Sequence, residues 1–265
     1  MSASNVEKIR NVAVDHHSEA AGVFENYYRD MARSRFSNAF TYGRFKVDVA
    51  LDAEVKRLAA GASILDVGCG TGAYLTRYAA SGFKVSGVEP AENMRIAAQK
   101  ANPGIQIENA VATELPFADA SFDFAFAIEV YRYLHLADFR RSMEEVLRVL
   151  KPGGRFFFTM VNRYALDGFY VLQRARQVVR RTLADNQNPH CEFFTPNELR
   201  AEMERAGMQD IEIYGRMLAG LRLAYKVPML GGLMAERLDA VDDLIHRSGL
   251  ATPFAGHLIA VGQKR

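Results

Sequence analysis

Ile64-Leu65-Asp66-Val67-Gly68-Cys69-Gly70-Thr71-Gly72 is a short apolar run that leads directly into three closely spaced glycines. The apolar run is typical of a buried strand, and a helical period follows at Tyr74–Ala80. Glycines in such a turn permit positive φ angles and let the backbone approach a ligand closely. The segment therefore predicts a strand, a tight loop and a helix, with the loop either binding a ligand or serving only as a turn.

Short apolar runs alternate with helical periods as far as residue 160. The expected strands are Ile64–Val67, Lys84–Val88, Ile105–Glu108, Phe122–Ala127 and Arg155–Met160. The expected helices between them are Tyr74–Ala80, Glu92–Ala101 and Asp138–Leu150, the last ended by Lys151-Pro152-Gly153-Gly154. This alternation predicts an α/β fold with a Rossmann-like, doubly wound sheet and right-handed crossovers. Two later runs, Asp210–Tyr214 and His257–Gly262, are expected to close a mostly parallel, seven-stranded sheet.

The composition is that of a globular protein with a large core: 265 residues, 49% hydrophobic and 24% charged, with a formal net charge of +2. This balance favours a small-molecule partner over nucleic acid. The two cysteines, Cys69 and Cys191, allow no disulfide framework or cysteine-rich zinc site, so we expect no metal and a cytoplasmic location. We also expect no secretory signal and no integral membrane segment, because long apolar runs are missing.

Two acidic residues after neighbouring strands distinguish between the possible ligands. Asp66 stands two residues before the first glycine, where its charge would oppose the pyrophosphate of a dinucleotide. The same carboxylate suits a ligand that carries an ammonium and a sulfonium but no phosphate, as S-adenosylmethionine does. Glu89 follows the next strand, roughly 20 residues later, near the spacing of an acid that binds ribose hydroxyls. Glu89 could instead cap the helix over residues 91–101.

Four motifs between residues 60 and 160 resemble those of the class I S-adenosylmethionine-dependent methyltransferases. They are Asp66-Val67-Gly68-Cys69-Gly70-Thr71-Gly72, Gly87-Val88-Glu89-Pro90, Leu115-Pro116-Phe117-x-Asp119-x-Ser121-Phe122-Asp123 and Val149-Leu150-Lys151-Pro152-Gly153-Gly154. The chain most resembles the branch typified by quinone-biosynthesis C-methyltransferases and other small-molecule enzymes. The resemblance implies S-adenosylmethionine as the cofactor.

The resemblance also implies which residues surround that cofactor. Gly68, Gly70 and Gly72 would wrap the methionine part, Glu89 would hold the ribose and Met94 would pack near the adenine. The family often has Asp-Ala near the adenine amino group, where this chain has Val111-Ala112. Adenine would then be recognised by backbone atoms around Ala112 and Thr113, or by another side chain.

The loop after the fourth expected strand should face the transferred methyl group, because ligands bind beyond the carboxyl ends of parallel strands. It reads Ile128-Glu129-Val130-Tyr131-Arg132-Tyr133-Leu134-His135. Quinone-branch relatives often show two histidines where Arg132 and Tyr133 stand, so the resemblance supplies no base. Glu129 is a candidate for binding the cofactor ammonium or the substrate. Tyr131 is either a catalytic residue or a packing residue at a helix start.

A general base is required only if the acceptor keeps its proton, and it typically contributes 10²–10⁴-fold. The histidines to consider are His135, His190 and His257. His190 stands in a polar-to-aromatic junction, Asn188-Pro189-His190-Cys191-Glu192-Phe193-Phe194. Because such loops often carry function, His190 is a catalytic candidate, the alternative being a buried, hydrogen-bonded histidine.

The regions outside the motifs are expected to select the acceptor. Residues 1–60 are interpreted as an N-terminal helical lid and 61–265 as the methyltransferase domain. Insertions at 161–195 and 216–255 would form a helical cap that excludes water. The residues expected either over the cofactor or in plain packing are Tyr27, Tyr42 and Arg44.

The expected function is methyl transfer from S-adenosylmethionine to an oxygen or carbon atom of a small metabolite. Arginines at 174, 176, 180 and 181 indicate either an anionic acceptor or a solvated helix face, and the apolar stretch Leu218–Met234 raises the alternative of a lipid-linked acceptor. Two rival hypotheses remain. The formal glycine pattern fits a nicotinamide-dependent oxidoreductase, and the missing adenine-side Asp fits a non-catalytic S-adenosylmethionine-binding protein.

Overall fold

The computed structural model describes residues 3–19, 35–165, 190–216, 230–247 and 252–265, together with Ala175, Ala224, Tyr225, Val227 and Gly249. Its strands are β1 Ser63–Val67, β2 Lys84–Val88, β3 Gln106–Glu108, β4 Phe122–Ala127, β5 Leu150–Val161, β6 Met208–Arg216 and β7 His257–Lys264. They form one sheet in the order β3-β2-β1-β4-β5-β7-β6. The first five strands are parallel, and β7 is antiparallel to both β5 and β6. The predicted doubly wound sheet and its closing pair are confirmed.

The helices alternate with these strands. They are α1 Ala3–Glu19, α3 Ala39–Val55, α4 Ala73–Ala80, α5 Glu92–Ala101, α6 Leu136–Val149, α8 Pro196–Arg205 and α10 Leu230–Arg247, with short 3₁₀ turns η1 Tyr131–Tyr133 and η2 Thr252–Phe254. Helix α8 begins with a capping box in which Thr195 and Glu198 satisfy each other's backbone amides, as the Thr195-Pro196 pair predicts. The arginines at 174, 176, 180 and 181, considered for an anionic acceptor or a solvated helix face, lie outside the described residues, as do residues 218–223 of the apolar stretch.

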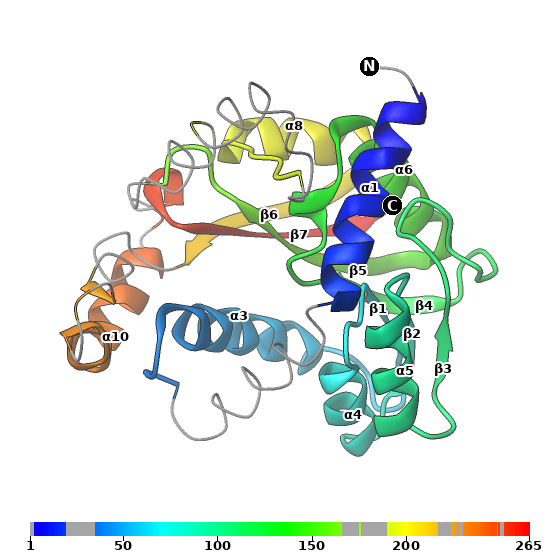
Figure 1. The fold of residues 1–265 in the computed structure, drawn as a ribbon, viewed down its shortest axis with the longest axis horizontal. Coiled ribbons are helices and arrows are strands. Elements are labelled where there is room, and N and C mark those ends of the chain that lie inside the picture. The colour runs from blue at the N-terminus through cyan, green and yellow to red at the C-terminus, as the bar shows by residue number, and fades with distance from the viewer. Residues whose placement is uncertain are drawn as a thin grey trace.

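Alternating side chains of the central strands face two different helical layers. On β4, Phe124 and Phe126 pack with α3 and α4, whereas Ala125 and Ala127 pack with α6 and α8. Figure 1 shows the sheet between these layers, with α10 at the end of the molecule opposite to α5 and β3. Because both faces of the sheet are covered, the carboxyl edge of the parallel strands is the open edge at which a site can form.

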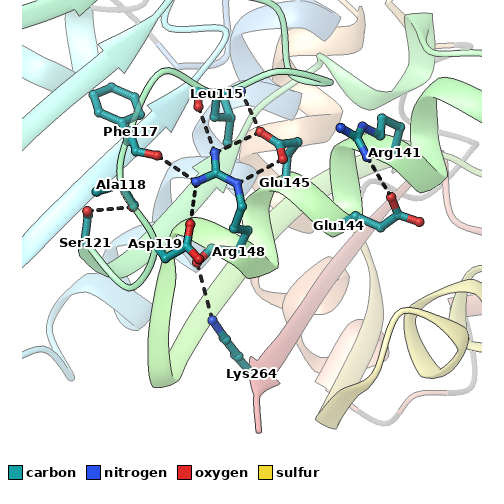
Figure 2. Close-up of polar contacts among 10 residues, drawn as sticks. All are labelled: Leu115, Phe117, Ala118, Asp119, Ser121, Arg141, Glu144, Glu145, Arg148 and Lys264. Atoms are coloured by element: carbon teal, nitrogen blue, oxygen red, sulfur yellow. Dashed lines mark hydrogen bonds and ion pairs between the residues drawn. The ribbon is translucent and has the colours of Figure 1, made fainter.

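The Leu-Pro-Phe motif is tied to α6 by a single guanidinium (Figure 2). Arg148 donates to the backbone oxygens of Leu115 and Phe117 at 2.8 and 2.7 Å. It also pairs with the carboxylates of Asp119 and Glu145 at 2.8 and 2.9 Å. Glu145 in turn accepts from the backbone amide of Leu115 at 2.8 Å. These contacts hold Leu115–Phe117 in place on the segment that leads from β3 into β4.

Helix α10 is bound to α3 by ion pairs around the buried Lys46. Lys46 is 2% exposed and lies 2.5 Å from the Asp239 carboxylate and 2.7 Å from that of Asp243. The hydroxyl of Tyr42 donates to Asp239 at 3.0 Å. Tyr42 therefore packs between these helices, which favours the packing alternative for it. Tyr27 lies outside the described residues. In the described part of the chain, no helix combines the length and apolar character needed to cross a bilayer.

Candidate active site

A cavity of about 170 Å³ lies at the carboxyl ends of β1, β2 and β4, and α1 and α3 complete its wall. Seven of the predicted cofactor residues line it: Asp66, Gly68, Gly70, Glu89, Met94, Ala112 and Glu129. Gly72 and Thr113 do not belong to its wall. The parallel strands bring these side chains together because their loops all leave the sheet at the same edge.

The glycine loop needs its glycines to fit against the loop after β4. Gly68 has φ +77°, and a Cβ atom there would lie 2.4 Å from a methyl carbon of Val130. Gly72 has φ +81°, and a Cβ atom there would lie 2.5 Å from the Asn102 amide nitrogen. Gly72 therefore serves the approach of α4 to α5, which corrects the expectation that it wraps the ligand.

Most amides of the loop are already engaged within the protein. Gly68 and Cys69 both donate to the backbone oxygen of Val88, at 2.9 and 3.0 Å. Gly70 donates to Glu89 at 2.8 Å, and the amide of Gly72 is bonded to the backbone oxygen of Cys69. A pyrophosphate would need such amides for itself. This loop therefore does not form the anion site of a dinucleotide enzyme.

Asp66 is a buried carboxylate that is incompletely paired. It is 2% exposed, and its Oδ2 atom accepts no hydrogen bond from the residues that the structure describes. Burial raises the pKa of Asp66 well above its usual value; the positive charge of Arg44 opposes this shift and the carboxylate of Glu89 adds to it. Arg44 itself lies 3.5 Å from the Asp48 carboxylate and 4.6 Å from the ring centre of Tyr74. A cationic group in the cavity would stabilise ionised Asp66.

Glu89 joins the glycine loop to α5. Its two carboxylate oxygens accept from the amides of Gly70 and Ala91, both at 2.8 Å. Burial raises the pKa of Glu89, while these two backbone hydrogen bonds lower it. Each carboxylate oxygen has a second lone pair, so Glu89 can serve α5 and still accept from a ligand hydroxyl. Capping of α5 and binding of ribose hydroxyls, the two alternatives that the sequence left open for Glu89, are compatible in this geometry.

Glu129 is the centre of a charged group beyond β4. It has φ +61°, and its amide donates to the Thr159 hydroxyl at 2.8 Å. Its carboxylate pairs with Arg132 at 2.9 Å and with His257 at 3.2 Å. Burial by itself would raise the pKa of Glu129, but the charges and hydrogen bonds of His257 and Arg132 hold it well below its usual value. The cavity wall therefore contains a carboxylate that stays ionised at neutral pH.

Tyr131 lies in the core and not in the cavity wall. It is 0% exposed, and its hydroxyl is 2.5 Å from that of Ser142 on α6. Its ring packs against Phe139 and Phe158, at centroid distances of 5.3 and 5.0 Å. Burial raises the pKa of Tyr131, so the hydroxyl remains protonated. The prediction of a catalytic role for Tyr131 is corrected to a packing role, and Tyr133 is the aromatic residue of η1 that lines the cavity.

His190 does not line the cavity. Its Nε2 atom is 3.2 Å from the Glu192 carboxylate, and its ring is 5.8 Å from that of His135. The following residue, Cys191, lies 3.5 Å from the Arg132 guanidinium. The structure thus places His190 beside His135 and Glu192 and not among the residues that line the cavity.

Comparisons with known proteins agree with this geometry. A family model described as a methyltransferase domain matches residues 65–158. O-methyltransferase resE of Aspergillus sclerotiorum is 32% identical over 199 residues, which cover 63% of this chain and 74% of that protein. Ubiquinone biosynthesis O-methyltransferase of Azorhizobium caulinodans is 31% identical over 180 residues, covering 66% and 70%.

A solved structure from Thermotoga maritima, described as a SAM-dependent methyltransferase and possible histamine N-methyltransferase, has a TM-score of 0.59 at 20% identity. It covers 94% of this chain and 98% of its own. At that identity the likeness supports the fold alone. The chain belongs to the class I S-adenosylmethionine-dependent methyltransferases. The alternative of a nicotinamide-dependent oxidoreductase is therefore wrong, in agreement with the engaged amides of the glycine loop.

S-adenosylmethionine is the cofactor of this methyltransferase, and the cavity has the features that this ligand requires. The incompletely paired oxygen of Asp66 suits a cationic ligand. Glu89 has acceptor capacity for hydroxyls, and Met94 and Ala112 supply a buried apolar wall for a ring. The charge and shape of these residues fit the cofactor without a metal ligand or a phosphate site.

No sequence motif marks the three α1 residues that line the cavity of this methyltransferase. His17 and Val14 of α1 line the cavity together with Ala13, although α1 has no motif and its helical pattern is weakly amphipathic. Arg44 was expected either over the cofactor or in packing, and the structure places it in the cavity wall. A helical pattern in a single sequence does not show which face of the helix packs over a loop that is far away in the chain.

Proposed function

We propose that this methyltransferase transfers the methyl group of S-adenosylmethionine to a hydroxyl oxygen of a small molecule. The observation that carries the proposal is the ionised Glu129 carboxylate in the cavity wall beyond β4, where the acceptor is expected. Such a carboxylate accepts a hydrogen bond from a hydroxyl and orients its oxygen. The names of the two relatives, both O-methyltransferases, support oxygen as the target.

Transfer to carbon is the alternative. A sterol 4-C-methyltransferase of Caenorhabditis elegans is 40% identical over 110 residues, but these cover only 32% of that protein. So short a match carries little information on the acceptor. The O-methyltransferases match over about 70% of their length, which favours oxygen.

Each of the proposed cofactor residues is assigned to one chemical part of the ligand. Asp66 would face the ammonium of the methionine part, with Arg44 available for its carboxylate, and Glu89 would accept from the ribose hydroxyls. Met94 and Ala112 would contact the adenine. When bound, S-adenosylmethionine supplies a methyl group on a positively charged sulfur, which a nucleophile takes by direct displacement. The protein's contribution is then to place the nucleophile in line with that bond and to exclude water.

Access to the cavity is proposed to depend on α1 and on residues beyond β5 and β6. Helix α1 supplies part of the cavity wall, and its Ser18 accepts from the amide of Asn93 at 3.2 Å. This arrangement supports the hypothesis of an N-terminal lid. Acceptor choice by the 161–195 and 216–255 regions, and an anionic or lipid-linked acceptor, remain hypotheses on residues that are mostly outside the described ones.

The test is transfer of labelled methyl from S-adenosylmethionine into the small-molecule fraction of a cell extract, followed by mass identification of the product. We expect a product in which one hydroxyl group has become a methoxy group. A product labelled on carbon would contradict the oxygen assignment. Binding of S-adenosylhomocysteine without transfer to any fraction would contradict the proposed activity and favour a binding protein.

A further inference from the structure

The start of strand β7 lies at the same edge of the sheet as the cavity. Strand β7 runs antiparallel to β5, with His257 opposite Val161 and Ile259 opposite Thr159. Because β5 is parallel to β4, the first residue of β7 meets the carboxyl ends of both strands. Figure 1 shows β7 between β5 and β6. This topology brings His257 to the loop after β4, although the two segments are far apart in the chain.

The Glu129 carboxylate accepts hydrogen bonds from three elements of the protein. Its Oε1 atom accepts from the Thr159 hydroxyl and from His257 Nε2, both at 3.2 Å. Its Oε2 atom accepts from the Arg132 guanidinium at 2.9 Å. A carboxylate has about four acceptor positions, so the described contacts leave room for a donor from the ligand. Glu129 lines the cavity and its side chain is 29% exposed, so a ligand can reach it.

The backbone of Glu129 has a conformation that its side-chain partners stabilise. Its φ of +61° lies in the left-handed region, which is uncommon for residues other than glycine. The Thr159 hydroxyl accepts from the Glu129 amide at 2.8 Å and donates to the Glu129 carboxylate. Such conformations persist where the surrounding contacts over-determine them, and they cluster at functional sites. The position of this carboxylate therefore depends on Thr159, Arg132 and His257.

His257 does not line the cavity, so any effect on the ligand acts through Glu129. An ionised carboxylate only accepts, so His257 Nε2 is the donor in both the neutral and the charged ring. Burial raises the pKa of Glu129, and the opposing contribution of His257 is larger than that of Arg132. Other titratable or charged groups come from η1, the segment before α8 and the rest of the cavity wall: Arg132, Tyr133, Cys191, Arg44, Asp66 and His17.

From these contacts we infer that His257 is a positioning residue that holds the Glu129 carboxylate in place for the acceptor hydroxyl. The inference rests on the proposed oxygen methylation. The carboxylate accepts the hydrogen bond of the hydroxyl and orients its oxygen toward the methyl carbon. As the oxygen–methyl bond forms, the electron pair of the sulfur–methyl bond stays on sulfur and the hydroxyl proton passes to solvent. Because an ionised carboxylate repels an anion, the substrate class is a small molecule whose reacting hydroxyl still has its proton when it binds.

The experiment compares His257→Leu and His257→Gln with Gln263→Leu as the matched control. Gln263 also lies on β7, but it donates to the backbone oxygen of Gly153 at 2.9 Å, at the end of the strand opposite to His257. Transfer of labelled methyl is measured on serial dilutions of the small-molecule fraction of a cell extract, and S-adenosylhomocysteine binding is measured by calorimetry.

The rate at limiting acceptor is the quantity that the positioning role predicts. We expect His257→Leu to lower it by about 10- to 10²-fold, because a misplacement of about 1 Å can cost 10²-fold. His257→Gln, whose amide can donate to Glu129, should retain more of the rate than His257→Leu. Gln263→Leu should keep the wild-type rate, and S-adenosylhomocysteine affinity should stay within about twofold in all three variants.

Three readouts separate positioning from a purely structural role. In the Glu129→Gln background, adding His257→Leu should change the rate by less than about twofold, because its effect acts through the carboxylate. Since His257 lowers the pKa of Glu129, the acid limb of the pH–rate profile should move to higher pH in His257→Leu. Nitrogen NMR of the unmutated protein should show that the neutral His257 ring is protonated at Nε2, a result that does not depend on turnover or on a variant's folding.

Several results would overturn the positioning role. They are an equal loss of rate with and without the Glu129 carboxylate, an unmoved acid limb, weakened S-adenosylhomocysteine binding in His257→Leu, and a neutral His257 ring protonated only at Nδ1. If the wild-type protein transfers no methyl to oxygen, the proposed function fails and the inference fails with it. If it does and His257→Leu behaves as the wild type, only the inference fails.

Discussion

Replacing Tyr131 by Phe tests whether η1 contributes a core residue or a catalytic one. The substitution removes one hydroxyl that lies 2.5 Å from Ser142 in a site where both residues are 0% exposed. The aromatic ring remains, so no large cavity forms. The main cost is the buried Ser142 hydroxyl that loses its partner, about 1–3 kcal/mol.

This cost is measurable by urea unfolding and by the melting temperature. For domains of roughly 150–250 residues, each kcal/mol lowers Tm by about 2–4 °C. Replacing Ser142 by Ala in the same chain removes both partners, a change that is nearly neutral in buried sites. We therefore expect Tyr131→Phe/Ser142→Ala to be more stable than Tyr131→Phe alone, which a double-mutant cycle quantifies.

The activity of Tyr131→Phe decides between the two roles. We expect its methyl-transfer rate and its S-adenosylhomocysteine affinity to stay within about twofold of the wild type, because the hydroxyl faces α6 and not the cavity. A large loss of rate with unchanged unfolding free energy would refute the reasoning and restore a catalytic role for Tyr131.

Three further substitutions follow from the described contacts. Asp66→Asn should weaken S-adenosylmethionine binding yet raise the stability of the ligand-free protein at neutral pH, because the raised pKa means that ionised Asp66 costs folding free energy. That gain should vanish toward the unfolded pKa of about 3.9. Glu89→Ala should lose at least about tenfold in cofactor affinity by calorimetry, since Glu89 would hold the ribose and also orders the loop. Arg148→Ala should lower the unfolding free energy by about 1–3 kcal/mol, because the backbone oxygens of Leu115 and Phe117 lose their donor.

For each of these substitutions, one result would contradict the role expected for the residue. Unchanged cofactor binding in Asp66→Asn would show that the Asp66 carboxylate does not contribute to binding the ligand. Wild-type affinity in Glu89→Ala would exclude the ribose role. A stability of Arg148→Ala equal to that of Arg141→Ala, an exposed arginine on the same helix, would show that the contacts in Figure 2 are energetically minor.

The sheet was predictable because its signals are local. Apolar alternation and the glycine and proline positions determine where β1 to β5 begin and end, and the structure differs by a few residues. At α6 the sequence pattern suggested a start at Asp138, whereas the helix begins at Leu136. Helix ends depend on tertiary contacts and are the least certain part of such predictions.

The acceptor side was harder to predict because its contacts are long-range. Glu129 was identified from its position after β4, but its partner His257 comes from β7, far along the chain. Tyr131 and Tyr133 look equivalent in the sequence, yet the turn η1 directs one into the core and the other to the cavity. The sequence did not indicate that α1 lines the cavity, because a helix without a motif does not show where it docks.

The engaged amides of the glycine loop have a consequence for protein engineering. The amides of Gly68 and Cys69 are bonded to the backbone oxygen of Val88, and the amide of Gly70 is bonded to the Glu89 side chain. Point substitutions at side chains would therefore leave the Gly68 and Cys69 donors engaged and could release only that of Gly70 for a diphosphate. Conversion to a diphosphate cofactor would therefore require a different backbone path between β1 and β2. The choice of acceptor can change through surface segments that leave this loop intact.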